Sequence, residues 1–254
     1  MYGDVKPSRI AAPLGKAGRD EGVKSSRSTG ASRAPVTRDR ALRVAVALAD
    51  EGGIESLSMR KLAQKLGVEA MSLYYHVKSK EDILDGMVDI VFSEIELPPA
   101  GAEWKTAMRE RAESARGVLT RHPWAVSLMD SRTTPGLATL THQDTVIGCL
   151  RAAGFSFAMT AHAMSLLDSY VHGFALQEAS LPFDVSGDIG AATESILEQQ
   201  EMQDGALPNL REMAFNHVLQ PGYAYRNEFE FGLRVILDGI EAALYLDLKS
   251  RSKI

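Results

Sequence analysis

The segment 58–80 is rich in side chains that can bind a charged partner, and it reads SMRKLAQKLGVEAMSLYYHVKSK. These side chains supply guanidinium, ammonium, imidazole and hydroxyl groups, all of which can donate hydrogen bonds. Such donors bind phosphate oxygens, and phosphate contacts supply much of the affinity of a protein for DNA. An arginine can also donate two hydrogen bonds to one guanine. The stretch therefore predicts a surface that contacts nucleic acid.

The distribution of charge agrees with this prediction. The chain has 254 residues and a net charge of −5. Residues 1–80 hold 15 Lys and Arg against 8 Asp and Glu, whereas the remainder holds 13 against 25. A basic front on an acidic body suggests a polyanionic partner for the front. Charge alone leaves open the alternative that the front serves only to keep the chain in solution.

A second set of polar residues interrupts apolar stripes further along the chain. Met164, Asp168 and His172 are spaced four apart, and His142 stands one turn before Val146. A polar group on an apolar helix face either has a partner in the core or faces a cavity. For any one of these residues alone, the better explanation is that its side chain has a partner in the hydrophobic core or faces solvent. A catalytic site is a minor alternative, because no nucleophile elbow, phosphate loop or HExxH motif is present.

The elements that would position the first set are short helices. Apolar spacing predicts a helix over 38–51 and a second one that Ser58 caps. A third would run from Glu69 to His76, and a fourth would begin after Ser79 and end at the LPPAG sequence of 97–101. The second and third helices, with a tight turn between them, form a helix-turn-helix whose second helix reads the major groove.

The rest of the chain also reads as helical. Helices are predicted near 103–121, 123–130, 135–153, 156–180 and 225–248, and strand signals are scarce, so the fold class is all-α. The predicted organisation is a disordered basic tail (1–36), a DNA-binding domain with its connecting helix (37–96) and a larger helical domain (97–254). The acidic segment 181–210 is interpreted as a mobile excursion, partly helical near 191–203.

Composition restricts the remaining possibilities. The single cysteine, Cys149, excludes an internal disulfide framework and a CxxC metal site. No apolar run approaches the ~20 residues that cross a bilayer, and no secretory signal is evident. We therefore expect a cytoplasmic protein with no membrane partner, no cofactor and no metal.

The sequence GIESLSMRKLAQKLGVEAMSLYYHVKSKEDILD resembles the N-terminal domain of the TetR family of bacterial transcriptional repressors. CLRAAGFSFAMTAHAMSLLDSYVHGFALQE and FEFGLRVILDGIEAAL are similar to the regulatory domain of the tetracycline-repressor branch. The resemblance implies an all-α homodimer, in which each subunit has a DNA-binding headpiece and residues 97–254 form the ligand-binding and dimerisation domain. Repression is the usual activity of the family.

By this resemblance the recognition helix covers 69–76. Residues expected to contact bases or phosphates are Ser58, Arg60, Ala70, Met71, Ser72, Tyr74, Tyr75, His76 and Lys80. Tetracycline repressors have Gln-Pro in place of Ala70 and Met71, and Trp in place of Tyr75. Loss of the amide removes an adenine-type contact, so the operator sequence should differ.

The polar residues that interrupt apolar stripes, such as His142 and Asp168, are better interpreted as lining a small-molecule cavity once the resemblance is considered. The expected lining residues are Trp104, Met108, Leu128, Met129, Thr133, His142, Val146, Met164, Asp168 and His172. Asp130, Ser169 and Gln177 stand where tetracycline repressors place two histidines and a glutamate. Serine and glutamine are poor ligands for a divalent metal, which argues against magnesium–tetracycline. A largely apolar effector with a few polar groups fits better, and a regulator without a ligand is the alternative.

The last helix carries the predicted dimer contacts. These are Phe231, Gly232, Val235, Ile236, Gly239, Ile240 and Ala243, and an ordinary intrachain core is the alternative explanation for them. The resemblance places this helix and the one at 156–180 in a four-helix dimer bundle. Two headpieces on a two-fold axis require a near-palindromic operator with half-sites ~34–36 Å apart. Effector binding would shift the helix at 79–96 and so disturb that spacing.

Overall fold

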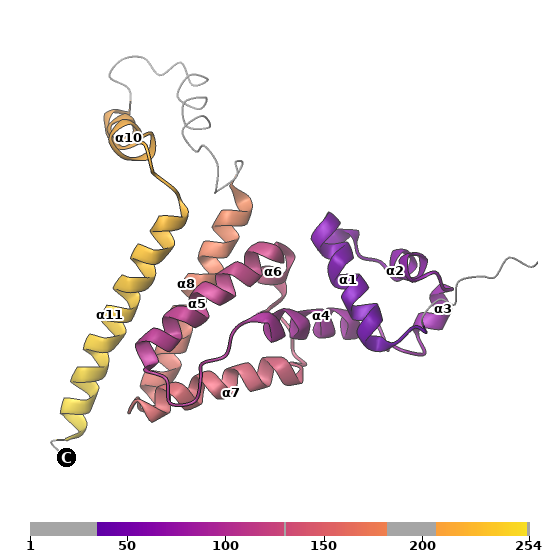
Figure 1. The fold of residues 1–254 in the computed structure, drawn as a ribbon, viewed down its shortest axis with the longest axis horizontal. Helices are drawn as coiled ribbons and strands as arrows, with labels where there is room; N and C mark the ends of the chain where they lie inside the picture. Colours follow the sequence, from indigo (N-terminus) through magenta and orange to yellow (C-terminus); the bar gives the residue numbers. More distant parts are fainter. Residues whose placement is uncertain (1–34, 130, 182–206, 253–254) are drawn as a thin grey trace, which may run out of the picture. The chain divides into compact units, whose positions relative to one another are not determined.

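The computed structural model describes residues 35–129, 131–181 and 207–252, and every regular element in these ranges is helical. The all-α prediction is therefore confirmed (Figure 1). The N-terminal part contains α1 (Arg38–Gly52), η1 (Ile54–Ser56), α2 (Met59–Leu66), α3 (Ala70–Leu73) and α4 (Lys80–Glu94). The body contains α5 (Trp104–Arg121), η2 (Pro123–Ala125), α6 (Val126–Met129), α7 (Leu137–Ala152), α8 (Phe157–Ser180), α10 (Pro208–Met213), the π-helical turn η3 (Ala214–Val218) and α11 (Arg226–Arg251).

Serine side chains fix where several helices begin. Ser58 accepts a hydrogen bond from the Lys61 amide (3.2 Å) at the start of α2. Ser79 accepts one from the Asp82 amide (3.1 Å) at the start of α4. Each bond satisfies an amide that has no partner inside its helix. The predicted Ser58 cap is confirmed, and so is the predicted start of the fourth helix after Ser79.

The third helix is shorter than predicted. Regular α-helix covers only Ala70–Leu73, and the chain continues to His76 as turns. There the amides of Tyr74 and Tyr75 bond to carbonyls three residues back instead of four. Such bonds tighten the last turn of a helix. The Val77 amide still bonds to the Leu73 carbonyl four residues back, and both residues are in the core.

One hydrophobic core extends from α1 to α11. Helix α4 contributes Ile83, Met87 and Val91, all almost completely buried, and it packs against both α1 and α7. The predicted boundary at 97–101 follows α4, and the division into two domains there stays an interpretation. The predicted tail (1–36) and acidic segment (181–210) lie mostly outside the described residues.

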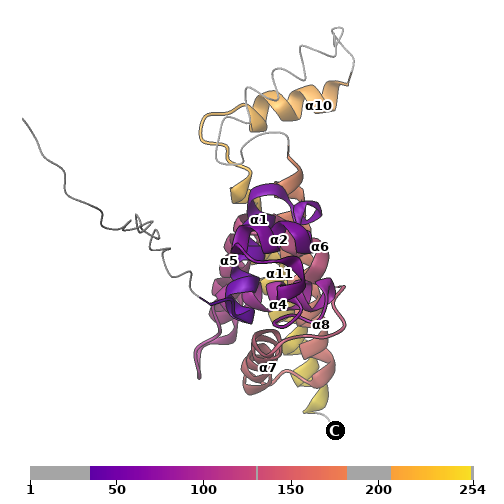
Figure 2. The ribbon, with the colours of Figure 1, turned by 90° about the vertical axis from the view of Figure 1, so that its right-hand side faces the viewer.

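Helices α5, α8 and α11 pack on one another in the body (Figures 1 and 2). The inner face of α11 is buried and includes Phe229, Leu233 and Leu237. Its outer face leaves Phe231 and Val235 more than half exposed. None of the described helices is long and apolar enough to cross a membrane.

Candidate DNA interface and effector cavity

The helix-turn-helix is built on a small apolar seam. Leu62, Ala63 and Leu66 of α2 and Leu73 of α3 are buried. Between the helices, Gly67 adopts φ 73°, a left-handed conformation that costs glycine little and other residues more. With these four apolar side chains turned inward, the unit leaves its other side chains on the surface for a partner.

Most residues predicted to contact DNA are on the surface. Ser58, Arg60, His76 and Lys80 are exposed. Tyr75 is 88% exposed, Met71 74% and Tyr74 49%. Ser72 and Ala70 are half-buried, and Ala70 packs against the core. Ala70 therefore has less surface available for the predicted contact with DNA.

The start of α4 is fastened to the helix-turn-helix. Asp82 accepts a hydrogen bond from Arg38 of α1 (2.8 Å) and another from the Lys78 amide (2.9 Å). Burial raises the pKa of Asp82, but these hydrogen bonds outweigh it, and the net pKa lies below the ordinary value. The carboxylate is therefore charged at neutral pH and links α1, the 74–79 turn and α4.

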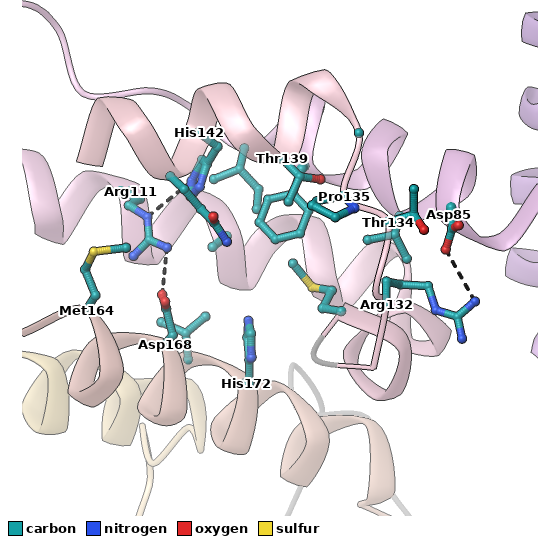
Figure 3. A pocket seen from close by; sticks show the side chains of 18 residues that line it. Asp85, Arg111, Arg132, Thr134, Pro135, Thr139, His142, Met164, Asp168 and His172 are labelled. Atoms are coloured by element: carbon teal, nitrogen blue, oxygen red, sulfur yellow. Dashed lines mark hydrogen bonds and ion pairs between the residues drawn. The ribbon is translucent and has the colours of Figure 1, made fainter. Parts of the chain in front are cut away.

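A cavity of about 180 Å³ lies in the body beside α4 (Figure 3). Of the predicted lining residues, Met129, His142, Met164, Asp168 and His172 do line it. Trp104, Met108 and Val146 are instead buried in the hydrophobic core, Leu128 packs against that core, and Thr133 is exposed. The apolar wall and the polar groups that the sequence did not single out are Asp85, Val88, Phe92, Ile95, Arg111, Ala115, Arg132, Thr134, Pro135, Gly136, Thr139, Gln143 and Val171.

One wall of the cavity is a hydrogen-bonded group of three side chains. Arg111 of α5 donates from Nη2 to Asp168 of α8 (2.7 Å) and from Nε to Nε2 of His142 on α7 (3.2 Å). Burial first, and then the positive charge of Arg111, lower the pKa of His142 from 6.5 to about 4, although Asp168 opposes the change. At neutral pH His142 is uncharged, and accepting at Nε2 places its proton on Nδ1.

This low pKa predicts a pH dependence of stability. Below pH ~6.5 the unfolded chain binds a proton at His142 that the folded chain does not bind, so stability falls as pH falls toward ~4. The loss from this group amounts to ~3 kcal/mol at most, at about 1.4 kcal/mol per pKa unit. We expect His142→Gln to lose less stability than the wild type between pH 7 and 4.5 in urea unfolding. Parallel pH profiles for the two proteins would contradict this assignment.

Three carboxylates of α4 hold the segment 132–139 that forms another wall. Glu81 and Asp85 accept from Nη1 of Arg132 at 2.6 and 3.5 Å. One turn further, Asp89 accepts from the amide of Thr139 (2.8 Å) and from its hydroxyl (3.0 Å), which caps the start of α7. A Cβ at Gly136 would stand 2.2 Å from Cγ of Asp89, so this close approach requires glycine.

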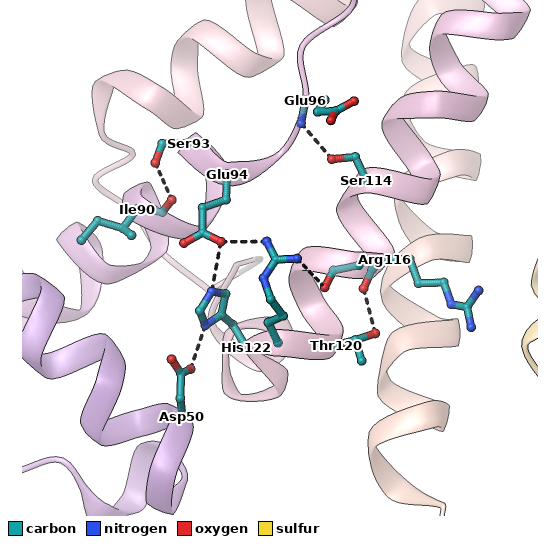
Figure 4. Close-up of polar contacts among 11 residues, drawn as sticks. Asp50, Ile90, Ser93, Glu94, Glu96, Ser114, Arg116, Thr120 and His122 are labelled. Atoms are coloured by element: carbon teal, nitrogen blue, oxygen red, sulfur yellow. Dashed lines mark hydrogen bonds and ion pairs between the residues drawn. The ribbon is translucent and has the colours of Figure 1, made fainter. Parts of the chain in front are cut away.

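A second polar cluster joins α1 to the body (Figure 4). His122, buried just after α5, contacts Asp50 of α1 through Nδ1 (2.7 Å) and Glu94 of α4 through Nε2 (3.3 Å). Trp124 donates to the same Asp50 oxygen (2.7 Å), and Arg121 donates to Glu94 (2.9 Å). The end of α1 and the end of α4 are thus held by one short segment of the body.

An ion pair is buried where α5, α8 and α11 meet. Arg116 donates two hydrogen bonds to Glu178, at 2.8 and 2.5 Å, and the side chains are 18% and 5% exposed. The Arg116 guanidinium also lies 5.1 and 4.8 Å from the ring centroids of Phe174 and Phe229. Its charge is therefore stabilised by the carboxylate and by two aromatic faces.

Ser169 and Gln177, which stand at metal-site positions by the resemblance to tetracycline repressors, are not among the residues that line this cavity. Ser169 is exposed, Gln177 accepts from the Tyr225 hydroxyl (3.0 Å), and Asp130 lies outside the described residues. In the described ranges no three His, Cys, Asp or Glu side chains gather as a metal would require.

The predicted dimer residues divide between two faces of α11. Phe231, Val235, Gly239 and Ala243 are exposed. Ile240 is buried in the core of its own chain and Ile236 packs against that core. Gly232 lies against Tyr170, because a Cβ there would come within 2.1 Å of the tyrosine hydroxyl.

Comparisons with known proteins agree with this architecture. A family model described as "Tetracyclin repressor-like, C-terminal domain" matches residues 97–244, and another described as "Bacterial regulatory proteins, tetR family" matches residues 41–87. An HTH-type transcriptional regulator of Saccharopolyspora erythraea is 39% identical over 145 residues, which are 57% of this chain and 61% of that protein. The chain thus matches about three-fifths of that relative's length.

Two further relatives match over most of the chain. The HTH-type transcriptional repressor DrrR1 of Streptomyces coeruleorubidus is 31% identical over 221 residues, covering 83% of this chain and 80% of DrrR1. The crystal structure of the TetR family protein ActR from Streptomyces coelicolor, in complex with actinorhodin, superposes with a TM-score of 0.67 at 28% identity. That match covers 83% of this chain and 99% of ActR. The chain therefore belongs to the TetR family of bacterial transcriptional regulators.

Proposed function

We propose that this regulator is a homodimeric repressor that leaves a near-palindromic operator when a small molecule binds the cavity. The observation that carries the proposal is the position of α4. Its first turn is bonded to α1 through Asp82, and its later turns supply Asp85, Val88 and Phe92 to the cavity wall. A change in the cavity can therefore reach the helix-turn-helix through one continuous helix.

Apolar surface on α8 and α11 supports the dimer. On α8, Leu166 and Leu176 are 53% and 54% exposed, and on α11 Phe231 and Val235 are 57% and 54% exposed. Large apolar side chains left exposed on packed helices favour an interaction surface there. A second copy related by a two-fold axis would cover these faces and place two recognition segments on successive major grooves.

The proposal makes effector and operator compete. If effector binds the off-DNA state more tightly, operator must weaken effector binding by the same factor. We would select the operator from a random DNA library and then titrate it by fluorescence anisotropy, with and without actinorhodin as a probe ligand. Falling operator affinity, matched by falling probe affinity in the presence of operator, supports the proposal. Probe affinity that is the same with and without operator contradicts it.

Arg60 gives a test of the DNA interface. Its side chain is exposed at the start of α2, where it can donate two hydrogen bonds to a guanine. We expect Arg60→Ala to weaken operator binding by ~1–3 kcal/mol and to relax the preference at one base pair. Arg43→Ala, which removes an exposed arginine on α1, is the control. Unchanged discrimination among single-base operator variants would show that Arg60 does not read a base.

A regulator without a small-molecule ligand is the second candidate. The cavity weighs against it, since ~10–15 Å³ is enough for one water and this cavity is many times larger. Operator affinity that no small molecule changes would favour this candidate.

A further inference from the structure

Arg132 is the cavity residue whose hydrogen bonds are incomplete. Its side chain is 17% exposed, and Nη1 reaches Glu81 and Asp85 of α4. Its Nε is buried and has no hydrogen-bond partner, and in the described part of the chain no other buried side-chain nitrogen or oxygen shares that condition. A buried donor without an acceptor is unfavourable, and most such groups in proteins have a partner.

The surroundings of Arg132 indicate where an acceptor could come from. The residue lines the cavity together with Thr134, Pro135 and Gly136, which follow it in the same segment (Figure 3). The carboxylates of Glu81 and Asp85 are already engaged with Nη1. An acceptor brought by a bound molecule is the partner that the cavity can supply to Nε.

The opposite wall does not offer the same opportunity. Arg111, the other arginine of the cavity, already donates from Nε to His142 and from Nη2 to Asp168. Apolar side chains, among them Val88, Phe92 and Met129, make up about half of the lining. The cavity thus combines apolar surface with one arginine whose Nε lacks an acceptor.

We propose that Arg132 determines specificity by binding an oxygen acceptor, such as a carboxylate, sulfonate or ketone, at one end of an effector that also has an apolar part. This inference rests on the proposed function, because it assigns the effector class for the same cavity. The effector oxygen accepts from Nε while Nη1 stays on the carboxylates of α4. Arg132 then contacts both the effector and α4.

Two dyes with the same ring system provide the test. 8-Anilinonaphthalene-1-sulfonate carries a sulfonate, and N-phenyl-1-naphthylamine is the same molecule without it. We would titrate both by fluorescence into the full chain and into Arg132→Ala. The variant should bind the sulfonate dye at least ~10-fold more weakly, the loss expected for a hydrogen bond to a charged group. Its affinity for the neutral dye should stay within about twofold.

Three further variants keep the result interpretable. Arg132→Lys retains the charge beside Glu81 but has no Nε donor, and it should also lose affinity for the sulfonate dye alone. Arg109→Ala removes an exposed arginine of α5 outside the cavity and should bind both dyes as the wild type does. Ala115→Met fills the cavity from α5 and should weaken both dyes together.

Each outcome supports or overturns a stated claim. Equal losses for the two dyes in the Arg132 variants, or no loss for the sulfonate dye, overturn the role of Arg132 and leave the cavity intact as an effector site. Unchanged binding of both dyes in Ala115→Met overturns the proposed use of the cavity and, with it, the role of Arg132.

Discussion

Replacing Arg116 with alanine is expected to lower the free energy of unfolding by ~3–5 kcal/mol, the range observed when one partner of a buried ion pair is removed. The reason is that Glu178, whose side chain is 5% exposed, would keep a charge without its two hydrogen bonds. Phe174 and Phe229 would also lose the guanidinium between them. Urea unfolding at one fixed protein concentration measures the effect, because the proposed dimerisation would make stability depend on concentration.

The controls for this prediction separate charge from packing. Arg109→Ala, on the exposed side of α5, should change stability by less than ~0.5 kcal/mol. The double variant Arg116→Met with Glu178→Leu should recover most of the loss, because no buried charge is then left unpaired. A loss below ~1 kcal/mol in Arg116→Ala would mean that the ion pair is not buried in solution.

Val235→Arg is expected to abolish the dimer and to weaken operator binding by at least ~100-fold. The side chain is 54% exposed in one chain, so the fold itself should tolerate arginine. In the proposed dimer the two-fold axis would bury two such charges in an apolar interface, which is strongly unfavourable. Sedimentation would measure the oligomeric state, and anisotropy with operator DNA would measure the affinity.

Glu230→Gln is the matched control for this experiment. It makes the same change in net charge at an exposed position of α11. This control should remain dimeric and bind operator as the wild type does. A Val235→Arg protein that stays dimeric would show that this face of α11 does not form the interface.

Local sequence signals were sufficient for the helices and their starts. Ser58 and Ser79 are caps that act on amides three residues away, so neighbouring residues carry the information. The predicted length of the third helix was wrong, because the amides of Tyr74 and Tyr75 bond three residues back instead of four. Apolar spacing does not reveal this change, since Leu73 and Val77 are one helical turn apart and are both buried.

Only half of the predicted lining residues line the cavity, because contacts between residues far apart in the sequence decide which side chains face it. Arg111 looks like a surface residue of a charged helix, yet it is buried because its partners stand 31 and 57 residues further along the chain. Trp104 and Met108 share the predicted helical spacing but face the hydrophobic core. An apolar stripe therefore indicates an inner face without indicating whether core or cavity lies behind it.

Prediction of the α11 residues had a similar limit. The sequence pattern grouped Val235 with Ile240, but the structure exposes the first and buries the second. Apolar residues cover nearly the whole circumference of this helix, so hydropathy cannot separate the face used within one chain from a face left for another.

The contact of His122 with Asp50 has a mechanical consequence. The headpiece is held to the body at the last turn of α1, through His122 and Trp124, and again at the early turns of α4, through Arg132. The end of α4 is held as well, because Glu94 contacts the same His122. Under the proposed function, an effector that changes the position of Arg132 would move the first turns of α4 while the ends of α1 and α4 stay in place, and the resulting tilt of the headpiece would change the spacing of two half-sites.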